Sequence, residues 1–225
     1  MRPVSHVIFD MDGLLLDTEP IYDTVLGDII ESYDKVYSDD LKLKIMGRTD
    51  QMFAKIIVGD LSLPITEDEF LDQFYRLCRQ RFLNVSLLKG AEQLIKHLHQ
   101  HNVPFCLATS ASLDIAEIKM RSHQHLFDLF SHKVMGSTDP EVKHGKPAPD
   151  IFLIAASRFA TKPSASDCLV FEDAPNGVKA AVAAGMQCVM VPDVIIADEQ
   201  RKEATLVLNS LAEFQPEVFG LPPFE

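Results

Sequence analysis

The sequence predicts an α/β fold, a doubly wound and mainly parallel sheet into which an α-helical cap domain is inserted. Three observations predict it. Short apolar segments rich in β-branched residues alternate with segments of helical spacing. Residues 19–88 interrupt this alternation with helical spacing and no convincing strand. Polar residues follow directly after several predicted strands, as expected where parallel strands end together at a ligand site.

The first apolar segment, residues 4–9, stops at Asp10 and is typical of a strand buried on both faces. Later segments repeat the pattern, and their alternation with helices calls for right-handed crossovers in one sheet. The further predicted strands are residues 104–108, 133–135, 168–171, 188–191 and 206–208. The predicted helices between them are residues 91–101, 115–122, 151–159 and 177–184.

The interruption divides the chain into two predicted domains, an α/β core of residues 1–17 and 89–225 and a helical cap of residues 18–88. Thr66, followed three residues later by Glu69, predicts a helix start with a capping box inside the cap. A lid of this kind can close a small site against water and select the substrate.

The composition is that of a globular protein, with 225 residues, 47% hydrophobic and 24% charged. A net charge of −12 argues against nucleic acid or an anionic membrane as partner, because both need clustered Lys and Arg. No apolar run approaches the ~20 residues that cross a bilayer, and the N-terminal residues become polar too early for a signal peptide. The four cysteines show neither a metal-binding spacing nor a disulfide framework. We therefore expect a cytoplasmic protein with reduced, buried thiols.

Acidic residues follow two of the predicted strands. Asp10 and Asp12 come after the first strand, and Glu172 and Asp173 come after the fourth. Carboxylates in an apolar setting are costly unless a cation neutralises them. Oxygen ligands favour a hard divalent ion, so we expect Mg²⁺.

Three further residues supply groups that could hold an anion. Thr109 and Ser110 follow the second strand, where a hydroxyl and backbone N–H groups could bind anionic oxygens. Lys146 supplies a fixed positive charge that could face the carboxylates. Together these residues predict a phosphoryl site.

In order and spacing, these residues resemble the four motifs of the haloacid dehalogenase superfamily of phosphohydrolases. Residues 10–18, DMDGLLLDT, resemble the first motif, Thr109 the second, Lys146 the third and residues 172–177, EDAPNG, the fourth. The likeness spans the chain and includes a cap inserted after the first motif. A single DxD is weak evidence, whereas four ordered motifs are specific. The resemblance implies a Rossmann-like core.

The resemblance also implies a phosphatase that works through an aspartyl-phosphate. Asp10 would be the nucleophile that takes the phosphoryl group. Asp12 would protonate the leaving alkoxide and then deprotonate the water that hydrolyses the intermediate. The implied Mg²⁺ ligands are the Asp10 carboxylate, the Asp12 backbone carbonyl and Asp173, with Glu172 as a further or water-mediated ligand. The groups that would hold the phosphoryl oxygens are Thr109, Ser110 and Lys146, of which Thr109 and Lys146 join the two aspartates as catalytic residues.

Each motif taken alone also has a structural interpretation. A DxD before glycine, as in residues 10–13, is often a turn. Residues 109–110 could cap a helix starting near Leu113, and residues 172–173 could suit the positive end of a helix. Lys146 before a proline could be loop charge.

Two further groups of residues leave their roles open. Helical geometry puts only His97 and His101 of three nearby histidines on one face, so we expect solvated side chains rather than a metal site. Lys42, Lys44 and Arg48 in the cap could reach a substrate, but a solvated helix face explains them as well.

The expected partner is a small phosphate ester, and two features narrow it. Related sugar-phosphate mutases place a histidine where this chain has Tyr22, which favours hydrolysis over mutase activity without excluding it. Residues 207–222 lie outside the catalytic pattern and resemble a narrower group of phosphatases within that superfamily. This resemblance implies pseudouridine 5'-phosphate as substrate. A sugar- or polyol-phosphate stays open, as does a non-catalytic binding protein on the same fold. The sequence does not predict the oligomeric state.

Overall fold

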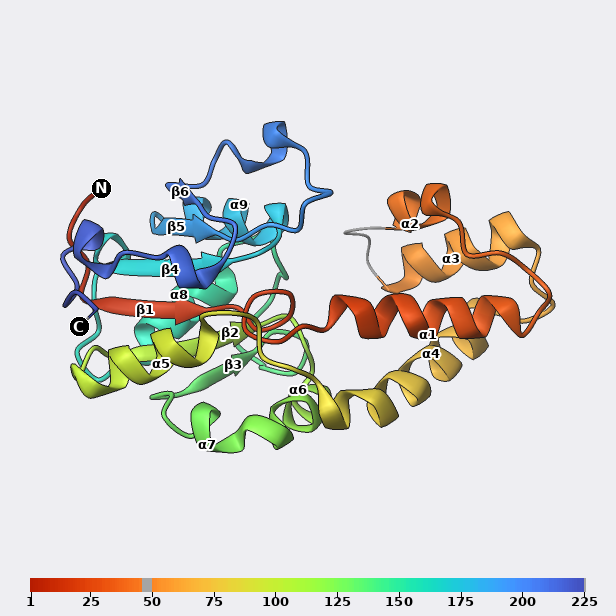
Figure 1. Ribbon diagram of the computed structural model, residues 1–225, viewed down its shortest axis with the longest axis horizontal. Helices are drawn as coiled ribbons and strands as arrows, with labels where there is room; N and C mark the ends of the chain where they lie inside the picture. The colour runs from red at the N-terminus through yellow and green to blue at the C-terminus, as the bar shows by residue number, and fades with distance from the viewer. Residues whose placement is uncertain (46–49, 225) are drawn as a thin grey trace. The chain divides into compact units, whose positions relative to one another are not determined.

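The computed structural model describes residues 1–45 and 50–224. The chain forms two compact units, one of Met1–Asp17 with Ser86–Glu225 and one of Thr18–Val85. We call them the sheet unit and the helical unit. The backbone leaves the sheet unit after its first strand and later returns to it (Figure 1).

The sheet has six strands among the described residues, in the order β3-β2-β1-β4-β5-β6, and every pair is parallel. The strands are β1 (His6–Phe9), β2 (Phe105–Thr109), β3 (Lys133–Met135), β4 (Cys168–Glu172), β5 (Gln187–Met190) and β6 (Leu206–Val207). The predicted fold class is confirmed. The direction of winding changes between β1 and β4, and this switch point is where ligands bind in open α/β sheets.

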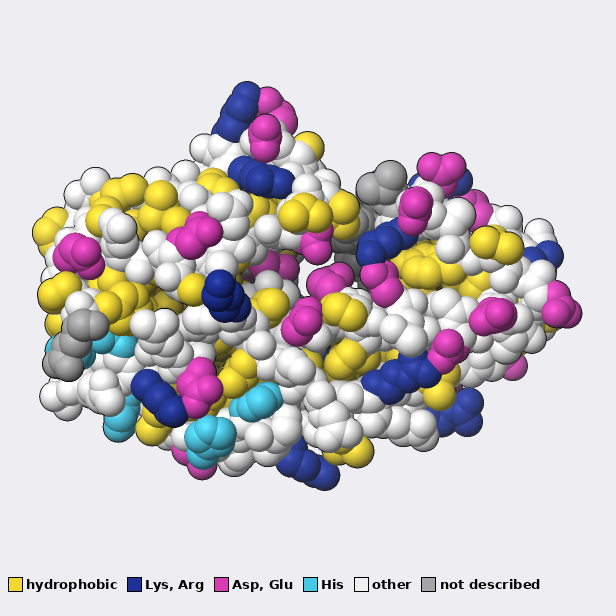
Figure 2. Space-filling model, in the orientation of Figure 1, with side chains coloured by type: hydrophobic (Ala, Val, Ile, Leu, Met, Phe, Trp, Pro, Cys, Tyr) yellow, Lys and Arg dark blue, Asp and Glu magenta, His cyan; other side chains and the backbone are white. Residues whose placement is uncertain are grey.

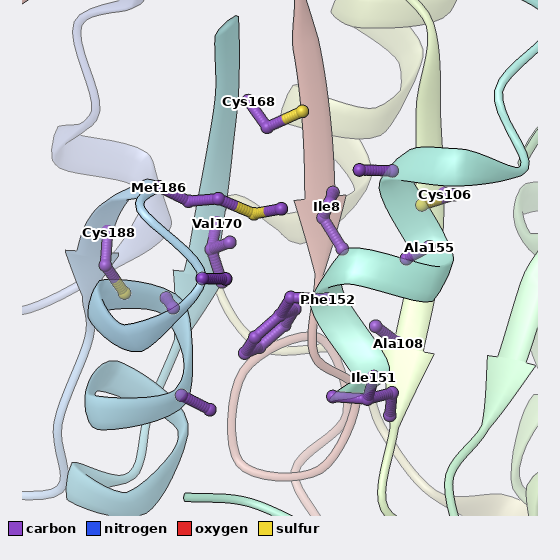
Figure 3. Packing of buried hydrophobic residues seen from close by; sticks show 14 of the residues in the cluster. Ile8, Cys106, Ala108, Ile151, Phe152, Ala155, Cys168, Val170, Met186 and Cys188 are labelled. Carbon is purple, nitrogen blue, oxygen red and sulfur yellow. The ribbon is translucent and has the colours of Figure 1, made fainter. Parts of the chain in front are cut away.

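Helices α8 (Asp150–Ser157) and α9 (Pro175–Ala183) cover one face of the sheet. Ile8 and Val170, from the two central strands, point into this layer, and Phe152 on α8 lies against them (Figure 3). These side chains are almost completely buried. Their packing fixes the position of α8, which follows Lys146 in the chain, relative to β1 and β4.

The other face of the sheet carries an aromatic layer. Phe9 stacks on Phe171 with ring centroids 5.0 Å apart, and Phe105 contacts Phe9 edge-on at 6.2 Å. Phe214 from the C-terminal segment meets Phe171 at 4.8 Å. Because successive residues of one strand pack on opposite faces, the strands carry apolar side chains on both faces, as the sequence predicts for buried parallel strands.

Three further helices belong to the sheet unit, α5 (Ala91–Gln100), α6 (Leu113–Met120) and the short α7 (Gln124–Phe127). The sequence does not predict α7, because four residues are too short for helical periodicity to register. The first strand is also shorter than predicted. The N–H of Val4 donates to the carbonyl of Phe219 instead of joining the sheet, at 2.9 Å.

The helical unit contains α1 (Glu19–Glu31), α2 (Asp39–Ile45), α3 (Asp50–Leu61), α4 (Glu67–Arg81) and the 3-10 turn η1 (Phe82–Asn84). The predicted capping box is confirmed, because the Thr66 side chain accepts from the Glu69 N–H while the Glu69 carboxylate accepts from the Thr66 N–H. The core of this unit is aromatic. Tyr22 stacks on Phe74 at 5.8 Å and meets Phe82 edge-on at 5.3 Å.

Two expectations about the whole chain can be checked here. The four cysteines are buried and carry no disulfide, as predicted. Within the described ranges, no helix has both the length and the apolar character needed to span a membrane.

Candidate active site

The loop after β1 brings two aspartates to the switch point. The N–H of Asp10 donates to the carbonyl of Phe171 at 3.0 Å, which continues the pairing of β1 with β4. The chain then turns back at Gly13, whose φ of +73° favours glycine. A Cβ at this position would lie 2.4 Å from a carboxylate oxygen of Asp173. Gly13 therefore makes room for an acid that arrives from the neighbouring strand.

Lys146 connects the ends of three strands. Its Nζ lies 2.5 Å from Asp10 Oδ1, 2.6 Å from Glu172 Oε1 and 3.2 Å from the carbonyl oxygen of Ala108. The Lys146 side chain is only 8% exposed, and Nζ lies 5.0 Å from the centre of the Phe152 ring. A buried ammonium needs such partners, so the loop-charge interpretation of Lys146 is wrong.

The loop that carries Lys146 is held near both of its ends. Asp150 Oδ2 accepts hydrogen bonds from the backbone N–H of Lys143 at 3.1 Å and of His144 at 3.0 Å. Arg158 forms a two-point ion pair with Asp139, at 2.5 and 2.9 Å. These anchors fix the position from which the ammonium reaches the carboxylates.

Glu172 has two roles at the end of β4. Its side chain is 1% exposed, and Oε2 accepts from the N–H groups of Asp173 at 3.0 Å and Ala174 at 3.1 Å, where α9 begins. The other oxygen, Oε1, contacts Lys146. A Cβ at residue 177 would lie 1.8 Å from Oε1, so only glycine fits there. Glu172 can therefore bind the start of α9 and position Lys146 at the same time, because each contact uses a different carboxylate oxygen.

The donor set at this site fits Mg²⁺. Carboxylate oxygens of Asp10, Glu172 and Asp173 all lie within 4.8 Å of one another. In the part of the chain that the structure describes, no other group of three or more acidic, histidine or cysteine side chains meets this criterion. All three donors are hard oxygens, which suit Mg²⁺ better than a soft transition metal.

The electrostatics of the site are those of buried, opposed charges. Burial is the main cause that raises the pKa of Asp10 to about 7; the Glu172 and Asp12 carboxylates act in the same direction, and the Lys146 ammonium acts against them. Burial alone would lower the pKa of Lys146, but Asp10 and Glu172 raise it more strongly, so the ammonium stays charged. A cation bound at the carboxylates would favour the ionised form of Asp10.

Thr109 and Ser110 lie at the end of β2. The Thr109 side chain is buried, and its Oγ1 accepts from the N–H of Ala111 at 3.2 Å. Ser110 is exposed. Neither residue caps α6, because Ser112 occupies the N-cap position.

Asp12 has a partner that the sequence interpretation missed. Lys119 on α6 donates to Asp12 Oδ1 at 2.6 Å, and the Lys119 side chain is 1% exposed. The available signal was the buried face of α6, where Lys119 falls at helical spacing from Ile115 and Ala116. A lysine on a buried helix face is unusual, and it indicates that an acidic partner lies nearby.

The remaining candidates do not join this cluster. The expectation of a solvated His97 is wrong, because the side chain is buried and Nε2 lies 2.8 Å from the carbonyl oxygen of Pro222. Lys42 pairs with Asp23 and Lys44 with Asp60, all within the helical unit. Arg48 lies outside the described residues.

Charged side chains outside the site are dispersed. On the visible face, Lys and Arg side chains are interspersed with Asp and Glu over both units (Figure 2). This distribution agrees with the excess of acidic residues in the sequence.

Buried acids and a lysine at the switch point of a parallel sheet are an arrangement suited to phosphoryl chemistry. Comparison with known families gives the class. Residues 4–185 match the haloacid dehalogenase-like hydrolases, and the chain belongs to this family.

Curated relatives show what kind of hydrolase this is. A Drosophila melanogaster protein named probable pseudouridine-5'-phosphatase is 51% identical over 100% of this chain and 97% of its own length. The (DL)-glycerol-3-phosphatase 2 of Arabidopsis thaliana is 46% identical, over 99% of this chain and 93% of its own. The resemblance seen in the sequence is confirmed, and the chain is a phosphatase that acts on small phosphate esters.

The fold also occurs in a different kind of enzyme. A solved structure of β-phosphoglucomutase from Clostridium difficile has a TM-score of 0.73 at 20% identity, and the match covers 96% of this chain and 95% of that one. At this identity only the fold is shared, so the likeness does not decide between hydrolysis and phosphoryl return to a sugar.

Proposed function

We propose that this protein is a Mg²⁺-dependent phosphatase that hydrolyses its ester through an aspartyl-phosphate on Asp10. The observation that carries the proposal is the position of the Lys146 ammonium, 2.5 Å from Asp10 and 2.6 Å from Glu172. The ammonium holds one oxygen of Asp10 at the strand end, where a phosphate ester would be attacked.

The reaction has two half-reactions. In the first, a carboxylate oxygen of Asp10 attacks phosphorus while the ester P–O bond breaks and Asp12 gives its proton to the leaving alkoxide. In the second, Asp12 takes a proton from a water molecule that attacks the aspartyl-phosphate. Free phosphate leaves, and the Asp10 carboxylate and the Asp12 acid are restored.

The neighbouring residues would hold the transferring oxygens. Thr109 Oγ1 already accepts from the N–H of Ala111, which leaves the hydroxyl hydrogen for a phosphoryl oxygen. Lys146 and the backbone near Ser110 would contribute further donors. Mg²⁺ at the carboxylates of Asp10 and Asp173, when bound, would neutralise charge on the phosphoryl group.

The formal charges support one divalent cation. The acids Asp10, Asp12, Glu172 and Asp173 face two buried lysines, Lys146 and Lys119. When all six groups are ionised, as after Asp12 has given its proton to the leaving group, two negative charges are left over, and one Mg²⁺ balances them.

For the substrate we propose pseudouridine 5'-phosphate, because the Drosophila relative that matches nearly the whole chain carries that activity in its name. Glycerol phosphate is the second candidate, on the strength of the Arabidopsis relative. We further propose that the helical unit is the cap that makes this choice.

Tyr22 supports hydrolysis over mutase activity. Its ring, which is partly buried, stacks on Phe74 and meets Phe82 edge-on, so aromatic contacts within the helical unit hold it. A tyrosine also lacks the neutral-pH proton exchange that makes histidine a general base.

The test is a panel of phosphate esters with Mg²⁺ that includes pseudouridine 5'-phosphate, uridine 5'-phosphate, glycerol 3-phosphate and small sugar phosphates. We expect free phosphate, with the highest kcat/KM for pseudouridine 5'-phosphate, and no activity in excess EDTA until Mg²⁺ is added. An isomeric sugar phosphate as product would establish a mutase. Ligand binding without turnover would establish a binding protein, and activity in EDTA would remove the metal from the proposal.

A cytoplasmic location is part of the same proposal. Four buried cysteines that form no disulfide suit a reducing compartment. Fractionation of cells that express the tagged chain tests it, and recovery with a membrane or organelle fraction would contradict it.

A further inference from the structure

Lys119 is the one described lysine whose side chain is as buried as the apolar core around it. It lies on the face of α6 that also buries Ile115, Ala116 and Met120. Its side chain is 1% exposed, although lysine is almost never fully buried without a partner. The methylene groups pack with the apolar face, and Nζ reaches Asp12.

Stability does not explain this lysine. A buried ion pair is weak evidence for stability, because desolvation offsets the attraction and an apolar residue of similar volume is often neutral or better. Asp12 is itself 24% exposed and could be solvated without the lysine. A methionine would complete the apolar face of α6 as Met120 does.

The contact instead fixes the orientation of a carboxylate. Lys119 holds Oδ1 of Asp12 at 2.6 Å, and the backbone around Asp12 is held by the N–H of Gly13 and the carbonyl of Leu16, 2.9 Å apart. With the backbone and one oxygen held, only the other oxygen, Oδ2, remains to exchange a proton. Proton transfer depends on such placement, because the donor must lie within hydrogen-bond reach of the leaving oxygen.

We propose that Lys119 is a positioning residue that holds the Asp12 carboxylate in the orientation needed for proton transfer to the leaving group. The inference rests on the proposed function, in which Asp12 is the acid and base. Lys119 then orients Asp12, which carries the proton, and Lys146 holds Asp10, the nucleophile.

The test compares two esters with the full chain and its Lys119→Met variant, in Mg²⁺. One is the alkyl phosphate of the panel that the wild type hydrolyses best, whose leaving alkoxide needs a proton. The other is p-nitrophenyl phosphate, whose leaving nitrophenolate needs none. The readout is kcat/KM, which reports on phosphoryl transfer to the enzyme. Lys96→Met is the matched control, because Lys96 forms an exposed ion pair with Glu92 elsewhere in the sheet unit.

We expect Lys119→Met to lower kcat/KM for the alkyl ester by about 10- to 100-fold, and for the nitrophenyl ester by less than about 3-fold. In an Asp12→Asn background the same change should add less than about 3-fold, because the group that it positions is already lost. The melting temperature should stay within about 4 °C of the wild type.

Equal losses on both esters, or losses that multiply fully with those of Asp12→Asn, would overturn the inference and assign Lys119 a structural role. If Lys119→Met fails to fold, Lys119→Gln keeps a polar group and is read by the same ratio of the two esters. A wild type that releases no phosphate from any ester contradicts the proposed function and the inference with it. An active wild type with equal losses contradicts the inference alone.

Discussion

The two units of this protein contain lysines that differ in how deeply they are buried. In the sheet unit, the Lys146 side chain is 8% exposed and two carboxylates hold it at the strand ends. In the helical unit, the side chains of Lys42 and Lys44 are 34% and 62% exposed, and they form ion pairs with Asp23 and Asp60. Exposed pairs contribute little to stability and can change freely, whereas buried charges must keep their partners. Under the proposed function, the chemistry depends on the buried charges of the sheet unit, and substitutions in the helical unit would change recognition.

The largest expected effect is the loss of the nucleophile. Asp10→Asn should lower kcat by at least about 10³-fold on every ester, because the amide cannot form the phosphorylated intermediate. Phosphate release from the purified variant measures it. Asp198→Asn is the control, because that carboxylate is 98% exposed. Near-normal turnover by Asp10→Asn would discard the assignment.

The next effect concerns the buried counter-charge. Lys146→Met should lower kcat/KM by about 10²-fold on all esters, because a preorganised donor to the phosphoryl group is lost. It should also lower the melting temperature in EDTA by several degrees, since Asp10 and Glu172 are left facing each other. Mg²⁺ should restore part of that stability. Wild-type kinetics in this variant would contradict the role proposed for the Lys146 ammonium.

A smaller effect is expected in the helical unit. A groove of about 330 Å³ is lined by Asp23, Tyr37 and Lys42, and the Tyr37 hydroxyl donates to Asp23 at 3.2 Å. Lys42→Met should change the ratio of kcat/KM between two natural esters by on the order of 10-fold, with kcat for p-nitrophenyl phosphate unchanged. Lys44→Met is the matched control. An equal loss of kcat/KM on all esters would contradict the assignment of substrate recognition to the helical unit and of chemistry to the sheet unit.

The smallest effect is a pH dependence of stability. Burial, together with the Glu172 and Asp12 carboxylates, raises the pKa of the Asp10 carboxyl from its usual value of 3.8 to about 7, against the opposing effect of Lys146. The folded protein therefore keeps a proton that the unfolded chain has lost, and its stability falls as pH rises from about 4 to about 7. In EDTA, Asp10→Asn should melt a few degrees higher than the wild type at pH 8 and nearly equal to it at pH 4. Equal melting temperatures at pH 8 would contradict the buried-charge account.

The sequence predicts those parts of the site that follow strands. Asp10, Thr109 and Asp173 could be found because the ends of parallel strands converge at one edge of a sheet. Lys146 follows no predicted strand, and only the need for a charge opposite the acids and the resemblance to the third motif point to it, since no local periodicity marks a loop lysine. Gly13 and Gly177, though inside the quoted motifs, were given no role, because only coordinates show that a Cβ there would meet a carboxylate.

Other features depend on tertiary contacts that a sequence does not display. Lys119 was missed because a charged residue in a helix is ordinarily assigned to solvent, and its partner lies 107 residues away. The sequence predicts a solvated His97 for the same reason, although its Nε2 contacts the carbonyl oxygen of Pro222 near the C-terminus. The helices of the helical unit were predicted only as a class, since their ends depend on packing between them.

The most direct test of the central claim is to trap the phosphorylated enzyme. The protein is mixed with substrate and Mg²⁺ and quenched in acid during turnover. Borohydride then cleaves any acyl phosphate, and peptide mass spectrometry locates the reduced residue. The account predicts a reduced side chain at position 10, in proportion to turnover, and none in Asp10→Asn. Steady release of phosphate with position 10 unmodified, or with the label on another residue, would contradict it.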